Sequence, residues 1–286
     1  MQDFFSLPSR SAKPRDEGVT HVIDKGLGLA QVEDMLATCS GHIDIVKLGW
    51  GTGYVTQNLK EKVALYHKAG IPVCFGGTLL EVAILQDRLD AFRKMTLDLG
   101  LSHVEVSNGV IDMTMKEKAK YIRDLSQDFV VLSEVGSKDS EKIIPPFRWV
   151  EMIQSDLDAG VWKVICEARE SGTVGLYFGS GEARSGLIDE ICTKIDHADL
   201  IFETPLKTQQ VYMVKKLGSE VNLGNIATNE VIPLETLRLG LRGDTMGDFH
   251  DVDIWNKRRD ADLAAELPRP ERRSRKRSPT KLTRVR

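Results

Sequence analysis

Short apolar runs rich in β-branched residues alternate with longer amphipathic segments along the chain. Between the runs, apolar residues recur at intervals of three and four, as in Val82, Leu85 and Leu89, the pattern of a helix with one buried face. The eight runs are Val19–Asp24, Ile43–Leu48, Pro72–Phe75, His103–Ser107, Phe129–Glu134, Val161–Glu167, Asp199–Glu203 and Glu220–Leu223. Eight strands that alternate with helices predict an α/β fold, the (β/α)8 TIM barrel.

The main alternative fold is an open doubly wound sheet, which usually carries a glycine-rich dinucleotide loop after its first strand. The stretch Gly26-Leu27-Gly28-Leu29 lacks the third glycine of that fingerprint, so we interpret it as a turn that leads into a helix. We therefore expect a single barrel domain over residues 1–250. Residues 251–268 are expected to add one further helix, over Ile254–Leu267.

The charge of the chain is divided unevenly. The 286 residues have a formal net charge of −3, but Arg269–Arg286 carries nine Lys/Arg and one Glu, a net of +8. The other 268 residues carry 30 basic and 41 acidic groups, a net of −11. The tail has almost no apolar residues to bury, so residues 269–286 are expected to be disordered. Contact with nucleic acid through this tail is a secondary interpretation, because no aromatic side chains are interleaved for base stacking.

The sequence shows no features of a membrane or secreted protein. No run approaches 18 consecutive apolar residues, and the N-terminus has no basic segment followed by an apolar core, so neither a transmembrane helix nor a signal peptide is expected. The cysteines Cys39, Cys74, Cys166 and Cys192 form no CxxC pair. We expect a cytoplasmic enzyme with reduced cysteines that assembles into a homo-oligomer.

Charged residues gather at the carboxyl ends of the predicted strands, the face where TIM barrels carry their active sites. Alternation along the strands directs Val104 and Val106 to the helices and Glu105 to the barrel axis. The same reasoning directs Trp162 to the helices and Lys163 to the axis. The charged residues at strand ends are Lys47, Glu105, Glu134, Glu167, Arg169 and Glu203. A structural salt-bridge network would explain one or two pairs, but the convergence of five strands favours a functional site.

Several carboxylates among Lys and Arg side chains suit a divalent cation together with an anionic ligand. Magnesium prefers oxygen ligands, whereas no HxH, HExxH or cysteine cluster indicates zinc. Asp24 is a further candidate ligand. The loops after the strands add polar and glycine residues, of which Gly224 and Asn225 fit the position that cradles a phosphate in many TIM barrels. Arg238 and Arg242 follow on the last helix, where either could close on a phosphate or carboxylate, although a surface position is the more common case.

Seven segments, in order along the chain, resemble the phosphosulfolactate synthase family over roughly residues 4–250. The basic tail departs from the family pattern. The first, at the start of the chain, is Phe5-Ser6-Leu7-Pro8-Ser9-Arg10 with Lys13-Pro14-Arg15 followed by Val22-Ile23-Asp24-Lys25-Gly26. The other six are Lys47-Leu48-Gly49-Trp50-Gly51-Thr52, Glu105-Val106-Ser107-Asn108-Gly109, Ser133-Glu134-Val135-Gly136, Glu167-Ala168-Arg169-Glu170-Ser171-Gly172, Val221-Asn222-Leu223-Gly224-Asn225 and Leu237 through Thr245.

The resemblance implies a TIM barrel that adds sulfite to phosphoenolpyruvate with Mg²⁺ and forms (2R)-2-O-phospho-3-sulfolactate, in coenzyme M or sulfolactate biosynthesis. On this basis Lys138 is the first candidate for the proton donor, and Lys47 is the second. The candidate Mg²⁺ ligands are Glu105, Glu134 and Glu167. The candidate substrate-binding residues are Arg169, Ser107, Asn108, Ser171, Gly224 and Asn225, together with Lys47.

Three other functions remain open at this point. A buried lysine, Lys163 or Lys47, could form a Schiff base as in an aldolase. A related lyase could add a different nucleophile to phosphoenolpyruvate. A barrel without activity could act through its basic tail, although unused buried charges would destabilise it.

Overall fold

The chain forms eight parallel strands in the hydrogen-bonded order β3-β2-β1-β8-β7-β6-β5-β4, as seen in a computed structural model that describes residues 4–137 and 143–266. Strands β3 and β4 lie next to each other and close the barrel, but no ladder joins them. The strands are β1 (Thr20–Asp24), β2 (Ile45–Leu48), β3 (Val73–Phe75), β4 (His103–Val106), β5 (Val130–Val135), β6 (Lys163–Cys166), β7 (Leu200–Glu203) and β8 (Leu223–Ala227). The predicted (β/α)8 barrel is confirmed.

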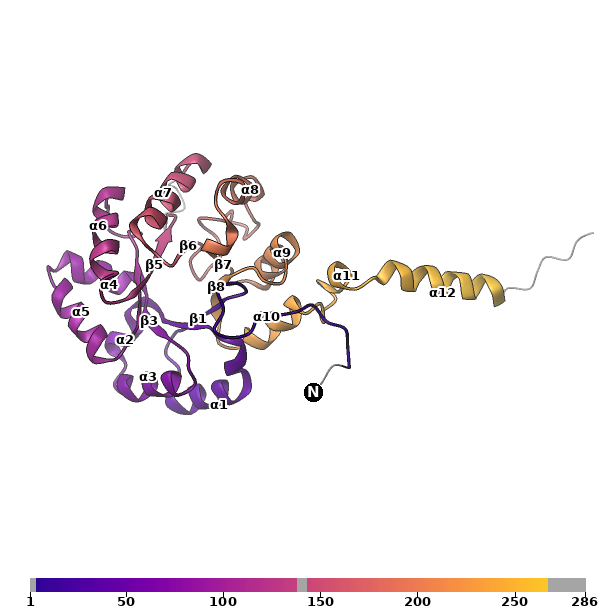
Figure 1. The fold of residues 1–286 in the computed structure, drawn as a ribbon, viewed down its shortest axis with the longest axis horizontal. Helices are drawn as coiled ribbons and strands as arrows, with labels where there is room; N and C mark the ends of the chain where they lie inside the picture. Colours follow the sequence, from indigo (N-terminus) through magenta and orange to yellow (C-terminus); the bar gives the residue numbers. More distant parts are fainter. Residues whose placement is uncertain (1–3, 138–142, 267–286) are drawn as a thin grey trace, which may run out of the picture. The chain divides into compact units, whose positions relative to one another are not determined.

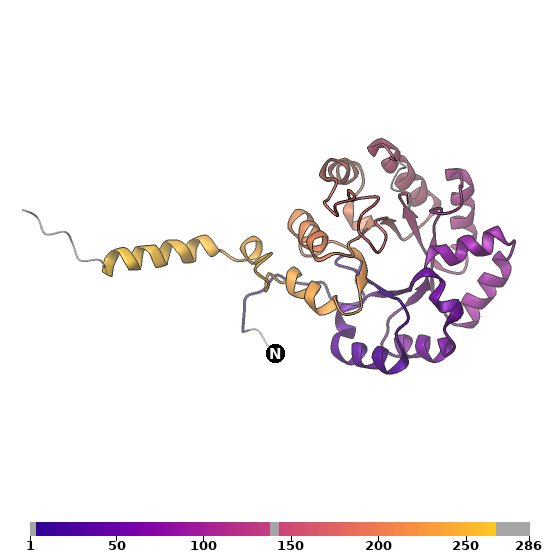
Figure 2. The ribbon, with the colours of Figure 1, turned by 180° about the vertical axis from the view of Figure 1, so that it is seen from behind.

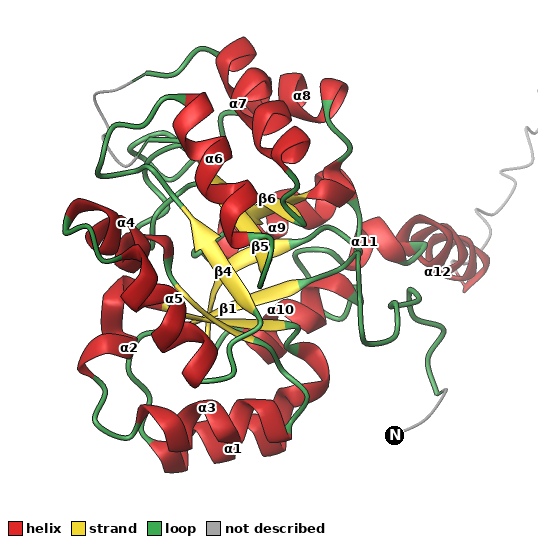
Figure 3. Ribbon diagram, turned by 60° about the vertical axis from the view of Figure 1, so that its left-hand side comes forward, coloured by secondary structure: helices red, strands yellow, loops and turns green. Residues whose placement is uncertain are grey.

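Helices surround the strands, as Figures 1 and 2 show from opposite sides, and Figure 3 shows the strands enclosed between them. Local sequence sets their ends: Thr114 and Glu117 form a capping box at the start of α6, and Gly160 ends α7 in the left-handed region. The helices of the barrel are α1 (Leu29–Cys39), α2 (Thr52–Val55), α3 (Leu59–Lys68), α4 (Gly77–Leu85), α5 (Leu89–Asp98), α6 (Met115–Leu125), α7 (Pro146–Ala159), α8 (Ser185–Lys194), α9 (Lys207–Leu217), α10 (Val231–Arg238) and α11 (Met246–Phe249).

The buried apolar residues that the structure describes form two clusters. Val104 and Val106 belong to the large cluster between strands and helices, as their alternation predicts. A smaller cluster fills the barrel interior and consists of Val19, Ile45, Cys74, Leu132, Ile165 and Ile201. The prediction for Trp162 was wrong: its side chain packs against the inner cluster and lies edge-on to His103. Trp162 precedes β6, where the strand alternation does not yet apply.

Strand β8 begins three residues later than predicted, so Gly224 and Asn225 lie within the strand and not in the loop that follows it. Ladder partners on β7 set this register, since Gly224 lies opposite Glu203. Asn222, the residue before β8, accepts a hydrogen bond from the Val19 amide through its side chain. The same side chain donates to the carbonyls of Ala198 and Leu200. In a parallel barrel the neighbouring strands decide where a strand begins. The composition of the β8 segment alone therefore does not show its first residue.

The amino-terminal face of the barrel is closed by arginines. Arg238 is fully buried and donates hydrogen bonds to the carbonyls of Ser219, Val221 and Val19. Arg10 reaches the same region and pairs with Glu235 at 3.0 Å. Arg238 therefore holds the start of β1 against the segment before β8. Neither a surface position nor a phosphate-binding role fits this residue.

The chain divides into two compact units, Met1–Phe249 and His250–Arg286. In the second unit the structure describes one helix, α12 (Val252–Glu266). The basic segment 269–286 lies outside the described residues. Among the described helices, none is both long and apolar enough to cross a membrane.

Candidate active site

A cavity of about 410 Å³ opens at the carboxyl ends of the strands, which is the face where TIM barrels place their chemistry. Four of the residues singled out from the sequence as candidate ligands or catalytic groups line it, together with Glu203 of β7. The lining consists of Ile23, Lys47, Gly49, Trp50, Gly76, Gly77, Thr78, Val110, Glu134, Glu167, Arg169, Glu170, Glu203 and Asn225. The four singled-out residues in this lining are Lys47, Glu134, Glu167 and Arg169. Asn225, at the phosphate-binding position predicted from the sequence, also lines the cavity.

Lys47 lies among three carboxylates at the carboxyl ends of the strands. Its ammonium lies 3.2 Å from Glu203 Oε1, 3.4 Å from Glu134 Oε1 and 3.5 Å from Glu105 Oε2. Burial by itself would lower the pKa of Lys47, but the carboxylates of Glu105, Glu203, Glu134 and Glu167 together hold that pKa well above its ordinary value. Lys47 therefore stays charged at neutral pH. A charged amine suits the binding of an anion better than a Schiff base.

Backbone amides hold two of the cavity carboxylates in place. Glu203 Oε2 accepts a hydrogen bond from the Ala168 amide at 2.9 Å, and Glu167 Oε1 accepts one from the Arg169 amide at 2.7 Å. Arg169 adopts a left-handed backbone with φ of 55°, which is uncommon for a residue with a side chain. Such turns are found at functional sites, and this one presents the Arg169 side chain at the rim of the cavity.

Glu105 differs from the other strand-end glutamates because it does not line the cavity. Its Oε1 lies 3.1 Å from His21 Nε2, and its Oε2 accepts a hydrogen bond from the Gly77 amide at 3.1 Å. Glu105 is 1% exposed. The structure thus places it deeper in the barrel than Glu134 and Glu167, and brings Glu203 to the cavity in its stead.

The loop after β4 is shaped by Glu81 of α4, which sequence reasoning missed. Its carboxylate accepts hydrogen bonds from the Ser107 hydroxyl and from the amides of Val110 and Ile111 at 2.7 and 2.8 Å. Ser107 is fully buried and supports the loop, and Asn108 is half-buried. Neither of these two predicted substrate-binding residues is part of the cavity lining. A lone glutamate in the apolar segment GTLLEVAIL is the signal that could have found Glu81.

Asn225 is the polar side chain that β8 contributes to the cavity. It has a left-handed backbone with φ of 54°, is 5% exposed, and its Oδ1 has no hydrogen-bond partner among the described residues. A buried acceptor of this kind is costly unless a ligand or water satisfies it. Ser171 lies on the loop after β6, where its hydroxyl is exposed and bonds Thr173 at 2.8 Å.

Three further residues singled out from the sequence are placed elsewhere. Asp24 accepts hydrogen bonds from Lys62 at 2.9 Å, from Tyr66 at 3.0 Å and from two amides, so its oxygens are engaged and do not fit a metal ligand. Lys163 donates to the Ala198 carbonyl at 2.7 Å and is not part of the cavity lining, which removes the support for a Schiff base there. Lys138 lies outside the described residues.

Comparison with known families agrees with the arrangement of the barrel and its cavity. The sequence model of the family described as (2R)-phospho-3-sulfolactate synthase (ComA) matches residues 8–244 of this chain. The chain belongs to this family. The match spans all eight strands and every residue of the cavity lining, so the phosphosulfolactate synthase resemblance drawn from the sequence motifs is confirmed.

Relatives with the name phosphosulfolactate synthase share almost their whole length with this chain. The protein from Bacillus subtilis is 46% identical over 249 residues, which cover 86% of this chain and 99% of the relative. The protein from Methanothermobacter thermautotrophicus is 40% identical, with 85% and 96% covered. Among solved structures, a 3-hexulose-6-phosphate synthase from Salmonella typhimurium is 14% identical, with a TM-score of 0.49 and 79% and 92% covered.

Proposed function

We propose that this phosphosulfolactate synthase family member adds sulfite to the CH₂ carbon of phosphoenolpyruvate and so forms (2R)-2-O-phospho-3-sulfolactate. The observation that carries the proposal is the set of cavity carboxylates around one lysine, in a barrel of this family. The three negative charges of Glu134, Glu167 and Glu203 exceed the single positive charge of Lys47. Such a cavity would repel two anionic substrates unless a cation were bound as well.

The donor set fits Mg²⁺. Glu134, Glu167 and Glu203 present carboxylate oxygens to a cavity that is large enough to leave room for water and substrate oxygens, and these are the ligands that Mg²⁺ prefers. When bound, the ion would stabilise the negative charge that develops on the substrate carboxylate after sulfite has added to the double bond. We propose these three residues as its ligands, with Glu105 in a supporting position.

The side chains of the cavity divide the remaining tasks. Lys47 stays protonated and would hold an anionic group of the substrate, while Arg169 at the rim would hold a second one. Asn225 would orient the phosphate or a water beside it. A lysine with a raised pKa is a poor proton donor, so Lys138 remains our first candidate to protonate the carbon that bears the phosphate.

The proposal is tested by incubating the protein with phosphoenolpyruvate, sulfite and Mg²⁺ and following the phosphorus NMR signals. We expect the enol-phosphate signal to be replaced by that of a phosphate ester, and to persist when sulfite or Mg²⁺ is left out. A folded protein that leaves the enol phosphate intact would refute the proposal. Product formation from phosphoenolpyruvate with another nucleophile, but not with sulfite, would favour the related lyase.

Two variants separate the roles within the site. Glu134→Gln should raise the Mg²⁺ concentration needed for half-maximal rate by about tenfold or more, whereas Glu33→Gln on the exposed surface of α1 should not change it. Lys138→Ala should lose turnover while substrate binding is kept. Full turnover of Lys138→Ala would remove Lys138 as the proton donor.

A further inference from the structure

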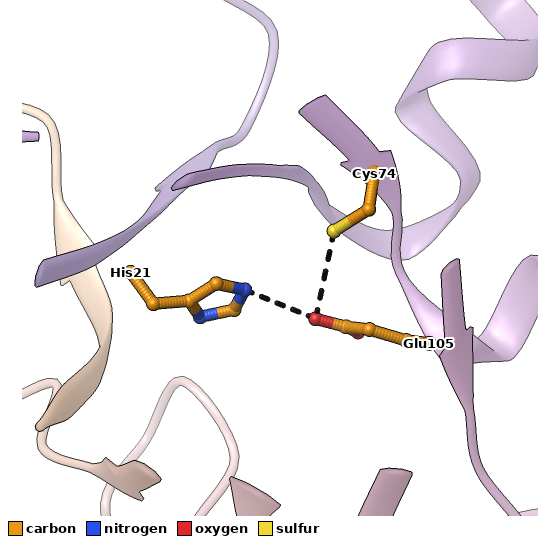
Figure 4. Close-up of side chains that lie close together, drawn as sticks. All are labelled: His21, Cys74 and Glu105. Atoms are coloured by element: carbon orange, nitrogen blue, oxygen red, sulfur yellow. Dashed lines mark hydrogen bonds and ion pairs between the residues drawn. The ribbon is translucent and has the colours of Figure 1, made fainter. Parts of the chain in front are cut away.

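A second group of potential metal ligands lies in the barrel, outside the cavity lining. It consists of His21 on β1, Cys74 on β3 and Glu105 on β4, whose ligand atoms all lie within 4.8 Å of one another. Figure 4 shows the His21 ring nitrogen and the Cys74 sulfur directed at the same carboxylate oxygen of Glu105. The three residues are 0–1% exposed. They come from three different strands, so their spacing in the sequence showed no metal motif.

Two of the three distances between the ligand atoms are close to those between ligands of one small ion, and all three atoms lie within 4.8 Å of one another. Cys74 Sγ lies 3.8 Å from Glu105 Oε1, and His21 Nε2 lies 3.1 Å from the same oxygen. With bonds of roughly 2.0–2.3 Å at tetrahedral angles, ligand atoms of zinc lie about 3.3–3.6 Å apart. We propose that His21 Nε2, Cys74 Sγ and Glu105 Oε1 bind a divalent transition ion of the zinc class.

The buried ring of His21 supports this site. The ring is completely buried and neither nitrogen makes a hydrogen bond to a described residue, while Nε2 makes an ion-pair contact of 3.1 Å with Glu105 Oε1. Buried polar atoms without partners are rare in folded proteins. The Gly224 backbone leaves room both for Ile201 and for the ring, since a Cβ at Gly224 would lie 2.9 Å from Ile201 Cγ2 and 3.3 Å from His21 Nδ1.

The charges and the surroundings also favour a cation. Cys74 belongs to the apolar cluster of the barrel interior, where a carboxylate such as Glu105 is stabilised by cations; Lys47 at 3.5 Å is one, and a bound ion would be a second. Binding releases the thiol proton of Cys74, and the thiolate and the carboxylate then balance the two charges of the ion. Glutamate and thiolate with a histidine are a ligand set that zinc accepts, with a fourth position left for water.

The position of the site in the barrel suggests what the ion does. Strands β3 and β4 close the barrel without a ladder between them, and Cys74 and Glu105 face each other across this seam at 3.8 Å. An ion bound to both would cross-link the two strands. It would also hold the glutamate that contacts Lys47 at 3.5 Å, and so position one of the lysine's partners.

The test measures metal content and needs no turnover, so its outcome does not depend on the proposed function. The full chain is purified from zinc-supplemented cells, freed of loosely bound metal with a chelating resin, and analysed by mass spectrometry for metals. We expect about one zinc ion per chain. After exchange for Co²⁺, a thiolate-to-cobalt absorption band should appear in the near ultraviolet, and the ion should raise the midpoint of thermal unfolding.

Variants assign the site. Cys74→Ala should lose the ion and the absorption band, whereas Cys166→Ala, which removes an equally buried thiol from the outer core, should keep both. If Cys74→Ala does not fold, His21→Gln, which keeps the thiol, should weaken Co²⁺ binding by more than about tenfold. Wild-type protein without bound ion and without the band, or a band that persists unchanged in the folded variants, would overturn the proposal.

Discussion

Replacement of Lys47 by methionine removes the cation on which the candidate site is built and keeps the volume of the side chain. The ammonium is nearly buried and lies 3.2–3.5 Å from three carboxylates. At an effective dielectric constant of about 20, one such contact is worth about 5 kcal/mol before desolvation is subtracted. Loss of one partner of a buried ion pair costs about 3–5 kcal/mol net. We expect Lys47→Met to lower the free energy of unfolding by this amount.

The assay is urea unfolding followed by circular dichroism at constant pH. The double variant Lys47→Met/Glu203→Gln should be more stable than Lys47→Met, because it removes one of the carboxylates that the first change leaves without its cation. Lys194→Met, which changes an exposed lysine of α8, should stay within about 0.5 kcal/mol of the wild type. An unchanged unfolding midpoint for Lys47→Met would refute the view that this ammonium neutralises the site.

Three further predictions concern the frame around the site. Gly175→Ala should destabilise the protein by about 2–3 kcal/mol, because φ is +60° and the new Cβ would lie 1.9 Å from a carbonyl oxygen; Gly179→Ala, with open space around it, is the control in the same urea assay. Lys118→Met should cost about 3–5 kcal/mol because it leaves Asp156 buried without its cation, and a second change, Asp156→Leu, should restore most of that loss in a double-mutant cycle. Burial tends to raise the pKa of Glu220, but hydrogen bonds and charge from the N-terminal segment lower it below its ordinary 4.5. Its stabilising effect is therefore complete above pH 4.5 and is lost as the pH falls through the lowered pKa, so unfolding midpoints of Glu220→Gln should fall less steeply in acid than those of the wild type.

Much of the candidate site could be predicted because strand ends in a parallel barrel share one face. Their positions at the ends of the predicted strands indicated Glu134, Glu167 and Lys47, and all three line the cavity. The prediction was less informative for Glu105, which has the same position on its strand but turns to His21. Alternation states that a side chain points inward, and its depth along the axis depends on the stagger of the neighbouring strands.

The roles of other residues depended on partners distant in the chain. Asp24 looked like a metal ligand at a strand end, yet Lys62 and Tyr66 of α3 occupy its oxygens. Glu81 was not considered, because a single glutamate in an apolar helix does not reveal that it holds the loop after β4. Hydrogen bonds of this kind form only after the helices have packed on the barrel.

The sequence by itself determined the alternation of strands and helices, the barrel that follows from it, the family, and the gathering of charge at one face. These depend on local periodicity and on motifs, which are written in consecutive residues. The tertiary structure decided the register of β8, the exchange of Glu105 for Glu203 at the cavity, and the meeting of His21, Cys74 and Glu105 inside the barrel. Each of these depends on residues from separate strands, and only closure of the barrel sets the distances between them.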